Sequence, residues 1–263
     1  MNQIHPTAVI SETAKLGKNN KIGPFCIIGS HVVMGDNNSL HSNVVLDGLT
    51  TIGDDNIFFP FAVVGTQTQD QKSQGGLTKL RVGNHNCFRE FCTVNTASDS
   101  DGETVIGNHC LIMISSHIGH DCVLEDHVRI TNCAGVAGHV HIGSYAIVGG
   151  LSGIHQFTRI GTHAMIGGGT AVVGDVIPYG MVVGERGHLA GLNNVGLKRR
   201  GFTKEEMRDI RLAYDMIFSA STDRIFAERV KLAKSECGES EVVKELIDFI
   251  ESDSSKNICK PKD

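Results

Sequence analysis

The 263-residue chain has no tryptophan and few aromatic residues, with three Tyr and eleven Phe. A core built on large rings is therefore disfavoured, whereas an apolar content of 40% excludes wholesale disorder and is enough for a sizeable core. The formal net charge of −5 provides no global basic field, so the composition argues against a nucleic-acid-binding protein. Glycine is in excess, with 31 residues, about 12% where roughly 7% is usual. We therefore expect a core of small and aliphatic side chains.

Export signals and cysteine pairs are missing as well. The first residues lack the basic start and apolar run of a signal peptide, and the eight Cys form no C-x-x-C pair. We therefore expect reduced thiols and a cytoplasmic protein. Residues 130–158 contain no Asp, Glu, Lys or Arg and are long enough to cross a bilayer, but their His, Asn, Gln and Gly argue against a membrane span.

A repeat of six residues organises the chain from Ile4 to Val172. Taking every sixth residue gives 29 positions, of which 26 are apolar where the composition predicts about 12. The following position is Gly 13 times, which suggests a residue that permits a tight turn. Such hexads are typical of parallel β-helices, in which three hexads form one triangular coil. We predict an all-β prism over residues 1–187, with residues 18 apart stacked about 4.8 Å apart on neighbouring coils.

Four cysteines share one position of this repeat with Ala, Ser, Thr and Val, so small core filler is favoured over a thiol nucleophile or zinc site: Cys26, Cys92, Cys110 and Cys122.

The hexad frame fails at Asp70, Gly76 and Ser100, inside polar stretches that cannot fill an apolar interior. We predict that loops near 66–81 and 95–105 leave the prism there. Loops on a rigid scaffold often carry functional residues.

The repeat ends after Pro178, and residues 188–263 are predicted to form a linker and a C-terminal helical domain. Thr203 and Glu206 fit a capping box, and further helices are expected over 223–234 and 241–251. The tail from residue 252 is expected to fray. A helical end-piece would cover the open strand edge of the last coil.

Histidines gather on a few adjacent coils. The stacking rule brings His120, His139, His155 and Gln156 together from three successive coils, and places His117 on the same coil as His120. Histidine suits general base catalysis because its ordinary pKa lies near neutrality.

Two neighbours of His120 suit the same chemistry. Asp121 follows it directly and could fix its tautomer, and Gly138 stacks on it with a backbone N–H that could face an oxyanion. No G-x-S-x-G motif is present, so a base acting on a substrate hydroxyl is favoured over a covalent intermediate. The alternative is that these histidines merely line a groove.

Four segments together resemble one family, the acyl-carrier-protein-dependent UDP-N-acetylglucosamine O-acyltransferases: 116–122 (SHIGHDC), 137–140 (AGHV), 154–157 (IHQF) and 196–202 (GLKRRGF). The resemblance runs along nearly the whole chain in the same order. It implies a left-handed parallel β-helix and a homotrimer with active sites between neighbouring prisms.

The resemblance also implies a reaction. An (R)-3-hydroxyacyl chain would pass from acyl carrier protein to the 3-position of UDP-N-acetylglucosamine, in the first step of lipid A biosynthesis. His120, supported by Asp121, would act as general base, and the sugar oxygen would attack the thioester directly, with the oxyanion at Gly138. No cofactor, metal, nucleic acid or membrane span is implied.

Further roles come from the same resemblance. Substrate-binding roles fall on nine residues: Asp70, Lys72, His117, His139, His155, Gln156, Asn193, Arg199 and Arg200. Gly168 and Arg186 match the far end of the acyl groove. Val195 departs from the pattern of many relatives at a position expected to contact the uracil. Asn95 departs from it near the sugar, which leaves the acceptor's 3-substituent open between hydroxyl and amine.

Three other readings stay open. A sibling UDP-3-O-acylglucosamine N-acyltransferase usually carries an extra N-terminal domain before its hexads, whereas hexads begin here at Ile4. A zinc-dependent prism lyase of the carbonic anhydrase type would hold a metal with His from adjacent coils. A non-enzymatic binding prism would tolerate the loss of His120.

Overall fold

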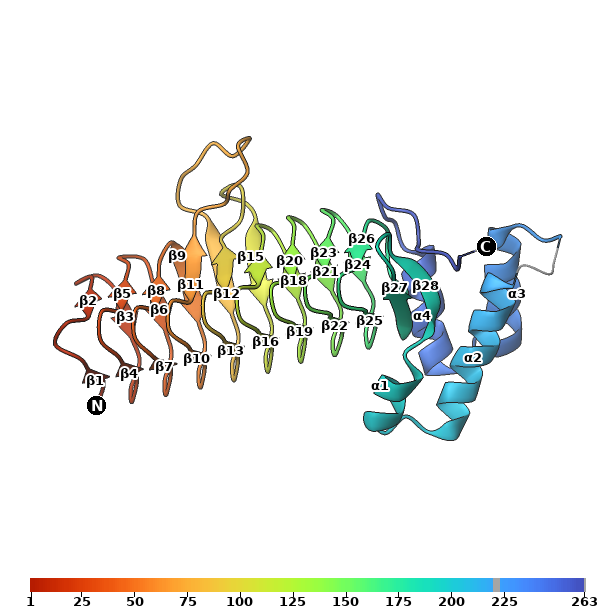
Figure 1. Cartoon of the computed structure of the whole chain (residues 1–263), viewed down its shortest axis with the longest axis horizontal. Coiled ribbons are helices and arrows are strands. Elements are labelled where there is room, and N and C mark those ends of the chain that lie inside the picture. The colour runs from red at the N-terminus through yellow and green to blue at the C-terminus, as the bar shows by residue number, and fades with distance from the viewer. Residues whose placement is uncertain (220–222, 263) are drawn as a thin grey trace.

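The computed structural model describes residues 1–219 and 223–262. Residues 220–222 and 263, which belong to the predicted C-terminal domain, lie outside the described residues. The chain coils around one axis into a long prism with a helical cluster at its C-terminal end (Figure 1). Three sheets of short strands form the faces of the prism, and each coil contributes one strand to each sheet. The predicted β-helix is therefore present.

The first sheet has 11 strands, ordered β1 (Gln3–Ile4), β4 (Lys21–Ile22), β7 (Ser39–Leu40), β10 (Ile57–Phe58), β13 (Cys87–Phe88), β16 (Leu111–Ile112), β19 (Arg129–Ile130), β22 (Ile147–Val148), β25 (Met165–Ile166), β27 (Gly180–Val183) and β28 (His188–Leu192). The second has nine: β2 (Val9–Ile10), β5 (Ile27–Ile28), β8 (Val45–Leu46), β11 (Val63–Thr66), β14 (Thr93–Asn95), β17 (His117–Ile118), β20 (Gly135–Val136), β23 (Gly153–Ile154) and β26 (Ala171–Val172). The third has eight: β3 (Lys15–Leu16), β6 (Val33–Met34), β9 (Leu49–Ile52), β12 (Lys79–Val82), β15 (Glu103–Ile106), β18 (Val123–Leu124), β21 (His141–Ile142) and β24 (Arg159–Ile160).

The predicted stacking of residues 18 apart is confirmed by the strand register. Ile118 pairs with Val136, and Val136 pairs with Ile154 in the next coil. The hexad aliphatics point into the prism, where Ile118 and Val136 have no exposed surface. Aliphatic side chains stacked in this way bury apolar surface continuously along the axis, which is the main stabilising term.

The glycines of the repeat serve a purpose different from the one expected. Gly23 does not adopt a positive φ; instead, a Cβ there would lie 2.8 Å from the carbonyl oxygen of His41 on the next coil. The turn itself falls on the second residue beyond, Phe25, with φ of 57°. Of the 13 glycines at this position, only Gly65 has a positive φ. The prediction that these glycines make the tight turn is therefore wrong for the other twelve, and at Gly23 close approach of the neighbouring coil is what excludes a side chain.

Buried asparagines form a ladder inside one corner of the prism. The Oδ1 atoms of Asn20, Asn38 and Asn56 each accept a hydrogen bond from the backbone N–H of the next asparagine, at 2.8–2.9 Å. Asn86 ends the ladder by accepting from the backbone N–H of Cys110 at 2.7 Å. The ladder satisfies turn N–H groups that the strands leave unpaired, as buried polar groups require.

Both predicted loops leave the prism at the corner between the second and third sheets, where they project as the protrusion in Figure 1. The first loop (67–78) connects β11 to β12, and the second loop (96–102) connects β14 to β15. They contact each other, because the Ser73 hydroxyl donates a hydrogen bond to the Ser98 carbonyl at 2.7 Å.

Four helices follow the last coils within the described residues: α1 (Asn194–Arg199), α2 (Lys204–Phe218), α3 (Phe226–Cys237) and α4 (Glu241–Glu251). The predicted capping box is present at the start of α2, where Thr203 and Glu206 cap each other. Helix α4 has the predicted bounds, whereas α3 starts and ends three residues later than predicted. No helix in the described part is long and apolar enough to cross a membrane. The proposed division at residue 187 falls in the turn between β27 and β28.

The C-terminal tail is hydrogen-bonded to the prism at residues 257–260, so the expectation that it frays is wrong for the described part of the tail, which ends at residue 262. The backbone N–H of Cys259 donates to the Asp175 carbonyl at 2.8 Å, and that of Leu189 donates to the Lys260 carbonyl at 2.9 Å. Cys259 is only 7% exposed. Backbone hydrogen bonds and one buried side chain therefore fasten the tail over the last coils.

The asparagine ladder predicts a stability effect. Replacing Asn56 by Ala leaves the Asn86 N–H, the Gly83 carbonyl and the Asn38 amide oxygen short of partners in a buried site. We expect Asn56→Ala to lower the free energy of unfolding by about 3 kcal/mol. Urea unfolding measures this, with the exposed Asn132→Ala as the control that should change it by less than about 0.5 kcal/mol. Equal effects of the two variants would contradict a structural role for the ladder.

Candidate active site

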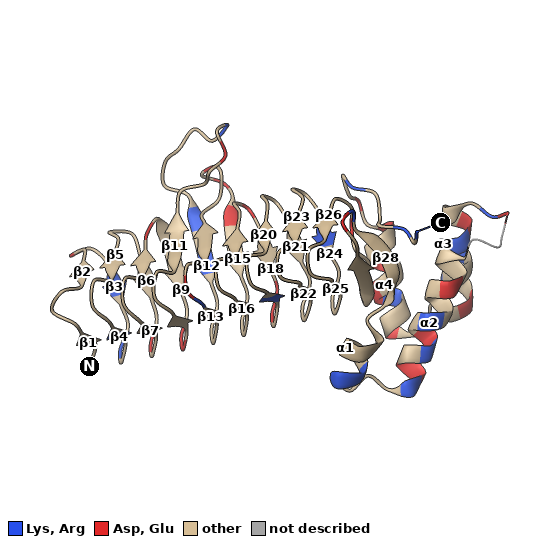
Figure 2. Ribbon diagram, viewed as in Figure 1, with Lys and Arg blue, Asp and Glu red and all other residues tan. Residues whose placement is uncertain are grey.

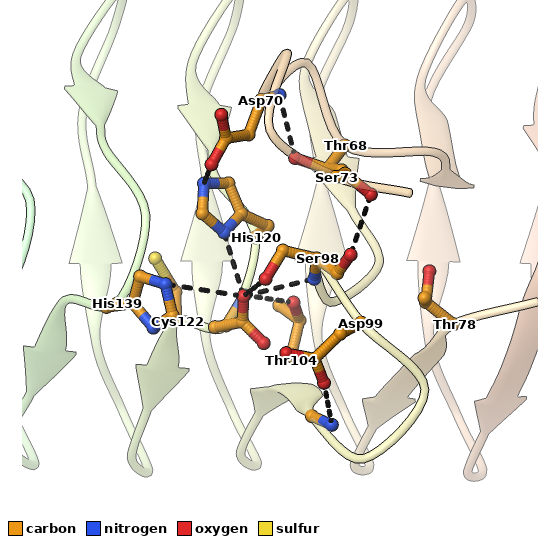
Figure 3. A network of polar contacts seen from close by, with 12 residues as sticks. Thr68, Asp70, Ser73, Thr78, Ser98, Asp99, Thr104, His120, Cys122 and His139 are labelled. Atoms are coloured by element: carbon orange, nitrogen blue, oxygen red, sulfur yellow. Dashed lines mark hydrogen bonds and ion pairs between the residues drawn. The ribbon is translucent and has the colours of Figure 1, made fainter. Parts of the chain in front are cut away.

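The site lies at the corner from which both loops emerge. His120 follows β17, and Asp121 turns the chain toward the third sheet with φ of 56°, in the left-handed region. Figure 3 shows His120 between the first loop above it and the second loop beside it. The side chains of His120 and Asp121 are only 13% and 11% exposed.

The contact between His120 and Asp121 fixes the imidazole tautomer. His120 Nδ1 lies 2.8 Å from Asp121 Oδ2, and an ionised carboxylate can only accept hydrogen bonds. Nδ1 therefore carries the proton, and Nε2 keeps its lone pair. Asp70 Oδ2 of the first loop lies 4.0 Å from Nε2, beyond hydrogen-bond distance. The imidazole is thus presented as a base with its free nitrogen under the first loop.

Asp121 is held ionised by its surroundings. Burial alone would raise the pKa of its carboxyl, but hydrogen bonds from Ser98 and His120 and the nearby His139 outweigh burial, so the pKa of Asp121 is lowered. Ser98 donates from its backbone N–H at 3.0 Å and its hydroxyl at 2.7 Å, both to Oδ2. His139 Nε2 lies 3.6 Å from the same oxygen. Such hydrogen bonding to the charged form stabilises the carboxylate at neutral pH.

Gly138 lies directly against the His120 ring. A Cβ at position 138 would stand 2.4 Å from both Cε1 and Nε2 of His120, so no side chain fits there while His120 keeps its position. Among the described residues, no acceptor takes the Gly138 backbone N–H. The predicted juxtaposition of His120 and Gly138 is thus present, with a free backbone donor beside the base.

The thiol nearest to this cluster is unreactive. Burial raises the pKa of Cys122 to about 12, and its Sγ donates to the Ala137 carbonyl at 3.0 Å. A protonated, buried thiol is a poor nucleophile. This agrees with the interpretation of the repeat-position cysteines as core filler.

An apolar groove of about 420 Å³ runs from the cluster along the outer face of the second sheet. His117 and His155 line this groove. The strand register places Gly135, Gly153 and Ala171 in one row with His117, each on the next coil along the axis. These positions are small, and nothing lies within 4 Å of a Cβ built at either glycine. Small residues in register therefore hollow the sheet face into a channel parallel to the prism axis.

His117 is held at the mouth of this groove. Its Nδ1 lies 2.8 Å from the Thr93 hydroxyl on the adjacent strand. Burial lowers the pKa of His117, and the neighbouring His120 lowers it further, so His117 is neutral at neutral pH. His139 stacks on Phe157 with 4.6 Å between ring centroids, and Gln156 precedes that ring on an exposed turn. The structure therefore brings the predicted histidines to one corner.

Other predicted residues lie apart from His120 within this chain. Lys72 is exposed on the first loop, beside the hollow between the two loops. Asn193 caps α1: its Oδ1 accepts from the Gly196 N–H at 3.0 Å, and its Nδ2 donates to the His163 carbonyl at 2.9 Å. Arg200 lies over the Tyr145 ring, 4.1 Å from its centroid, at the corner between the third and first sheets.

The basic end of α1 is therefore at a different corner from the histidine cluster. Figure 2 shows its Lys and Arg at the edge of the molecule farthest from the two loops. Arg199 is exposed there. Gly168 lies at the third corner, between the first and second sheets, and Arg186 forms a bridge with Ala171 at the end of the groove. Val195 is 62% exposed on α1.

Two site residues escaped the sequence reasoning. Ser98 supplies two of the hydrogen bonds to Asp121, yet it lies in the second loop, where the hexad frame gives no position. Asn95 was noted only as a departure; its Nδ2 donates to the Gln67 carbonyl at 3.0 Å and fastens the base of the first loop. The only signal in the sequence for Ser98 was that it is a serine in a loop that leaves the prism at the catalytic corner.

Among the described residues, one group could accept a metal ion. Ligand atoms of His120, Asp121 and His139 lie within 4.8 Å of one another. Asp121 Oδ2 already accepts from Ser98 and His120, so a metal at that atom would compete with these hydrogen bonds. The arrangement fits a hydrogen-bonded base and carboxylate better than an open zinc site, in which ligands point at a shared vacant position.

Comparison with known proteins agrees with the fold. Residues 175–259 match the family described as Udp N-acetylglucosamine O-acyltransferase, domain 2, and residues 13–48 and 103–138 match the bacterial transferase hexapeptide repeats. The fold and the repeats thus define a hexapeptide-repeat transferase with a left-handed parallel β-helix.

The relatives are similar over their whole length. An acyl-(acyl-carrier-protein)–UDP-N-acetylglucosamine O-acyltransferase of Thermodesulfovibrio yellowstonii is 42% identical over 261 residues, covering 99% of this chain and 100% of the relative. The one of Bartonella bacilliformis is 44% identical, with coverage of 99% and 94%. The crystal structure of the UDP-N-acetylglucosamine acyltransferase of Bacteroides fragilis superposes with a TM-score of 0.93 at 34% identity, covering 98% of this chain and 100% of that one. The chain belongs to the acyl-carrier-protein–UDP-N-acetylglucosamine O-acyltransferase family.

The hydrogen bonds from Ser98 predict a pH-dependent effect on stability. Because the pKa of Asp121 is lowered in the folded protein, its carboxylate stabilises the fold fully above the usual Asp pKa of about 3.9, and this contribution is lost as the pH falls through the lowered value. We expect Ser98→Ala to lower the free energy of unfolding by about 1.5 kcal/mol at neutral pH. The loss should shrink below about pH 4.

Urea unfolding at neutral and acidic pH measures both values. Ser100→Ala, at an exposed position of the same loop, is the control and should leave stability unchanged. A loss that is the same at both pH values would show that Ser98 does not act through the charge of Asp121.

Proposed function

We propose that this chain transfers a 3-hydroxyacyl group from acyl carrier protein to the 3-position of UDP-N-acetylglucosamine, the first step of lipid A biosynthesis. The observation that carries the proposal is the His120 base at the mouth of an apolar groove. Asp121 orients this base, and its ring packs against Gly138, whose backbone N–H has no acceptor among the described residues. Family membership supplies the substrates, since the relatives are named for them.

His120 moves the proton. Its Nε2 lone pair accepts the proton of the sugar 3-hydroxyl as the oxygen attacks the thioester carbonyl carbon. The carboxylate of Asp121 stabilises the resulting imidazolium through Nδ1, 2.8 Å away. When the tetrahedral intermediate collapses, the carbon–sulfur bond breaks, and the imidazolium returns the proton to the leaving thiolate. General base catalysis of this kind contributes about 10²- to 10⁴-fold to the rate.

Gly138 stabilises the oxyanion. Its backbone N–H is without a protein acceptor in the described structure and lies beside the base, so it can donate to the oxygen that becomes negative. A fixed backbone donor needs no reorganisation during the reaction.

The groove takes the acyl chain. It is lined by backbone and small side chains of the second sheet, and it starts beside His117 and His155. Asp70, 4.0 Å from His120 Nε2, is placed to accept a hydrogen bond from a sugar hydroxyl. His139, 3.6 Å from Asp121, and the exposed Gln156 are further candidates for contacts with the sugar. Arg186 forms a bridge with Ala171 at the end of the groove, and Gly168 lies on the same coil as Ala171, so both are candidates for contacts with the end of a long chain.

A trimer explains why the basic end of α1 lies at another corner. Arg199 and Arg200 suit a diphosphate, because guanidinium groups bind phosphate oxygens in a bidentate manner. Within one chain they lie away from His120, whereas a threefold arrangement of prisms would place them beside the cluster of the next subunit. Asn193 would then act by capping and orienting α1.

We expect His120→Ala to lower the rate of transfer by at least 10³-fold while the fold survives, because the base is lost and the prism interior is untouched. The assay incubates the protein with UDP-N-acetylglucosamine, its 3-amino analogue and a series of hydroxyacyl carrier proteins, and identifies each product by mass. The mass also decides between hydroxyl and amine acceptors.

The control is His31→Ala, an exposed histidine far along the prism, which should leave the rate unchanged. Turnover of the His120→Ala variant at the wild-type rate would overturn the mechanism. Stoichiometric zinc in the purified protein, with activity lost on chelation, would instead favour a metal site at His120, Asp121 and His139.

A shared site predicts complementation between inactive variants. His120→Ala and Arg200→Ala should each be strongly impaired alone, but mixed trimers formed by co-expression should recover about a third of wild-type activity, because one of the three interfaces in every mixed trimer joins an intact His120 to an intact Arg200. Recovery is measured after separating the mixed trimers by two affinity tags. No recovery above the single variants would place both residues in one chain's site.

A further inference from the structure

Ser98 of the second loop has contacts that lead to both carboxylates beside His120. The imidazole has one carboxylate near each nitrogen: Asp121 Oδ2 lies 2.8 Å from Nδ1, and Asp70 Oδ2 lies 4.0 Å from Nε2. Figure 3 shows Ser98 beside His120 and in contact with Ser73 of the first loop. The environment of both ring nitrogens therefore involves one residue outside the hexad frame.

Toward Asp121, Ser98 acts as a donor. Its backbone N–H and its hydroxyl donate to Asp121 Oδ2 at 3.0 and 2.7 Å, the oxygen that also accepts from His120. The other oxygen, Oδ1, packs against Gly102, where a Cβ would stand 2.4 Å from it. Across the described residues, Ser98 and His120 supply every hydrogen bond to this carboxylate. Ser98 therefore fixes the carboxylate from the side opposite the base.

Toward Asp70, Ser98 acts as an acceptor. Its carbonyl accepts a hydrogen bond from the Ser73 hydroxyl at 2.7 Å, and the Ser73 backbone N–H donates to the Asp70 carbonyl at 3.1 Å, which closes the turn that carries Asp70. Thr78 and Thr96 also link the two loops, through hydroxyls 2.6 Å apart, but at the base of the loops. The contact between Ser73 and Ser98 thus fastens the turn itself to the second loop.

We infer that Ser98 is a positioning residue for both carboxylates that flank His120. Its N–H and hydroxyl orient Asp121 behind the base, and its carbonyl holds, through Ser73, the turn that presents Asp70 to the sugar. The inference rests on the proposed function, which assigns the proton to His120 and a sugar hydroxyl to Asp70. One residue then sets the geometry on both sides of the reacting oxygen.

Five titratable side chains face His120 and Asp121 from the elements around them: Asp70, Asp99, His117, Cys122 and His139. Replacing Ser98 by Ala leaves all of them in place and removes one neutral donor from Asp121 Oδ2. The carboxylate then interacts more strongly with a protonated His120, because its charge is shared with fewer hydrogen bonds. The protonated, inactive form of the base should therefore persist to higher pH in this variant.

The first experiment measures kcat/KM against pH for Ser98→Ala and Ser98→Thr. We expect Ser98→Ala to move the acid limb of the profile to higher pH by about half a unit, whereas Ser98→Thr keeps a hydroxyl and should restore the wild-type limb. Ser100→Ala, at an exposed position of the same loop, is the control and should leave the profile in place. An unmoved acid limb in Ser98→Ala would overturn the role of Ser98 at the base, even if the rate falls.

The second experiment tests the contact with the first loop. Ser73→Ala removes the donor to the Ser98 carbonyl and leaves the hydrogen bonds of Asp121 intact. We expect KM for UDP-N-acetylglucosamine to rise about fivefold, with kcat within about twofold of wild type and the acid limb in place. Gln71→Ala, an exposed residue of the same loop, is the matched control. An unchanged KM in Ser73→Ala would overturn the link between Ser98 and Asp70.

A measurement without turnover keeps the inference separate from the proposed function. If the wild-type protein transfers no acyl groups, the proposed function fails. NMR of the ¹⁵N-labelled histidine rings then follows the titration of His120, identified by the signals that disappear in His120→Ala, with circular dichroism as the check on folding. The titration should move to higher pH in Ser98→Ala but not in Ser100→Ala. Coincident titrations of Ser98→Ala and wild type would overturn the inference whether or not transfer occurs.

Discussion

The backbone hydrogen bonds between successive coils lock each residue over its counterpart, and the rest of the molecule depends on this register. His120 meets Gly138 because Ile118 pairs with Val136, two residues earlier on both coils. The two loops respect the same constraint. Pairing joins Val64 to Val94, 30 residues apart, and Val94 to Ile118, 24 apart, so each loop lengthens its coil by a whole number of hexads. The loops therefore leave and rejoin the prism without shifting an inward side chain outward.

This constraint also decides what the sequence could predict. The interior aliphatics, the loop positions and the meeting of His120 with Gly138 follow from a period, and a period can be counted. Ser98 could not be found in this way, because it belongs to a segment without a repeat, whose course is set by contacts far along the chain. The reason for Gly23 was missed for a similar cause: the clash that excludes a side chain is with another coil, not within its own turn.

The candidate site divides its tasks between periodic and aperiodic parts. The prism supplies His120, Gly138 and the groove on a rigid face, and their spacing is that of the coils. The second loop supplies Ser98, whose hydroxyl and backbone N–H hold the Asp121 carboxylate in its charged form. Chemistry placed on segments of this kind can change by substitution in a loop, while the positions of the base and the oxyanion donor remain fixed by the scaffold.

The two ends of the prism differ in how they are covered. At the C-terminal end, β27, β28 and the tail close the last coils, whereas at the other end Ile4 and Val9 remain 48% and 64% exposed. A stack of repeats behaves as a one-dimensional array in which each unit is stabilised by its neighbours. Its opening free energy is therefore graded: the first coils fray at little cost, and the cost rises toward the middle coils that carry the site. The catalytic corner thus occupies the part of the array that opens last.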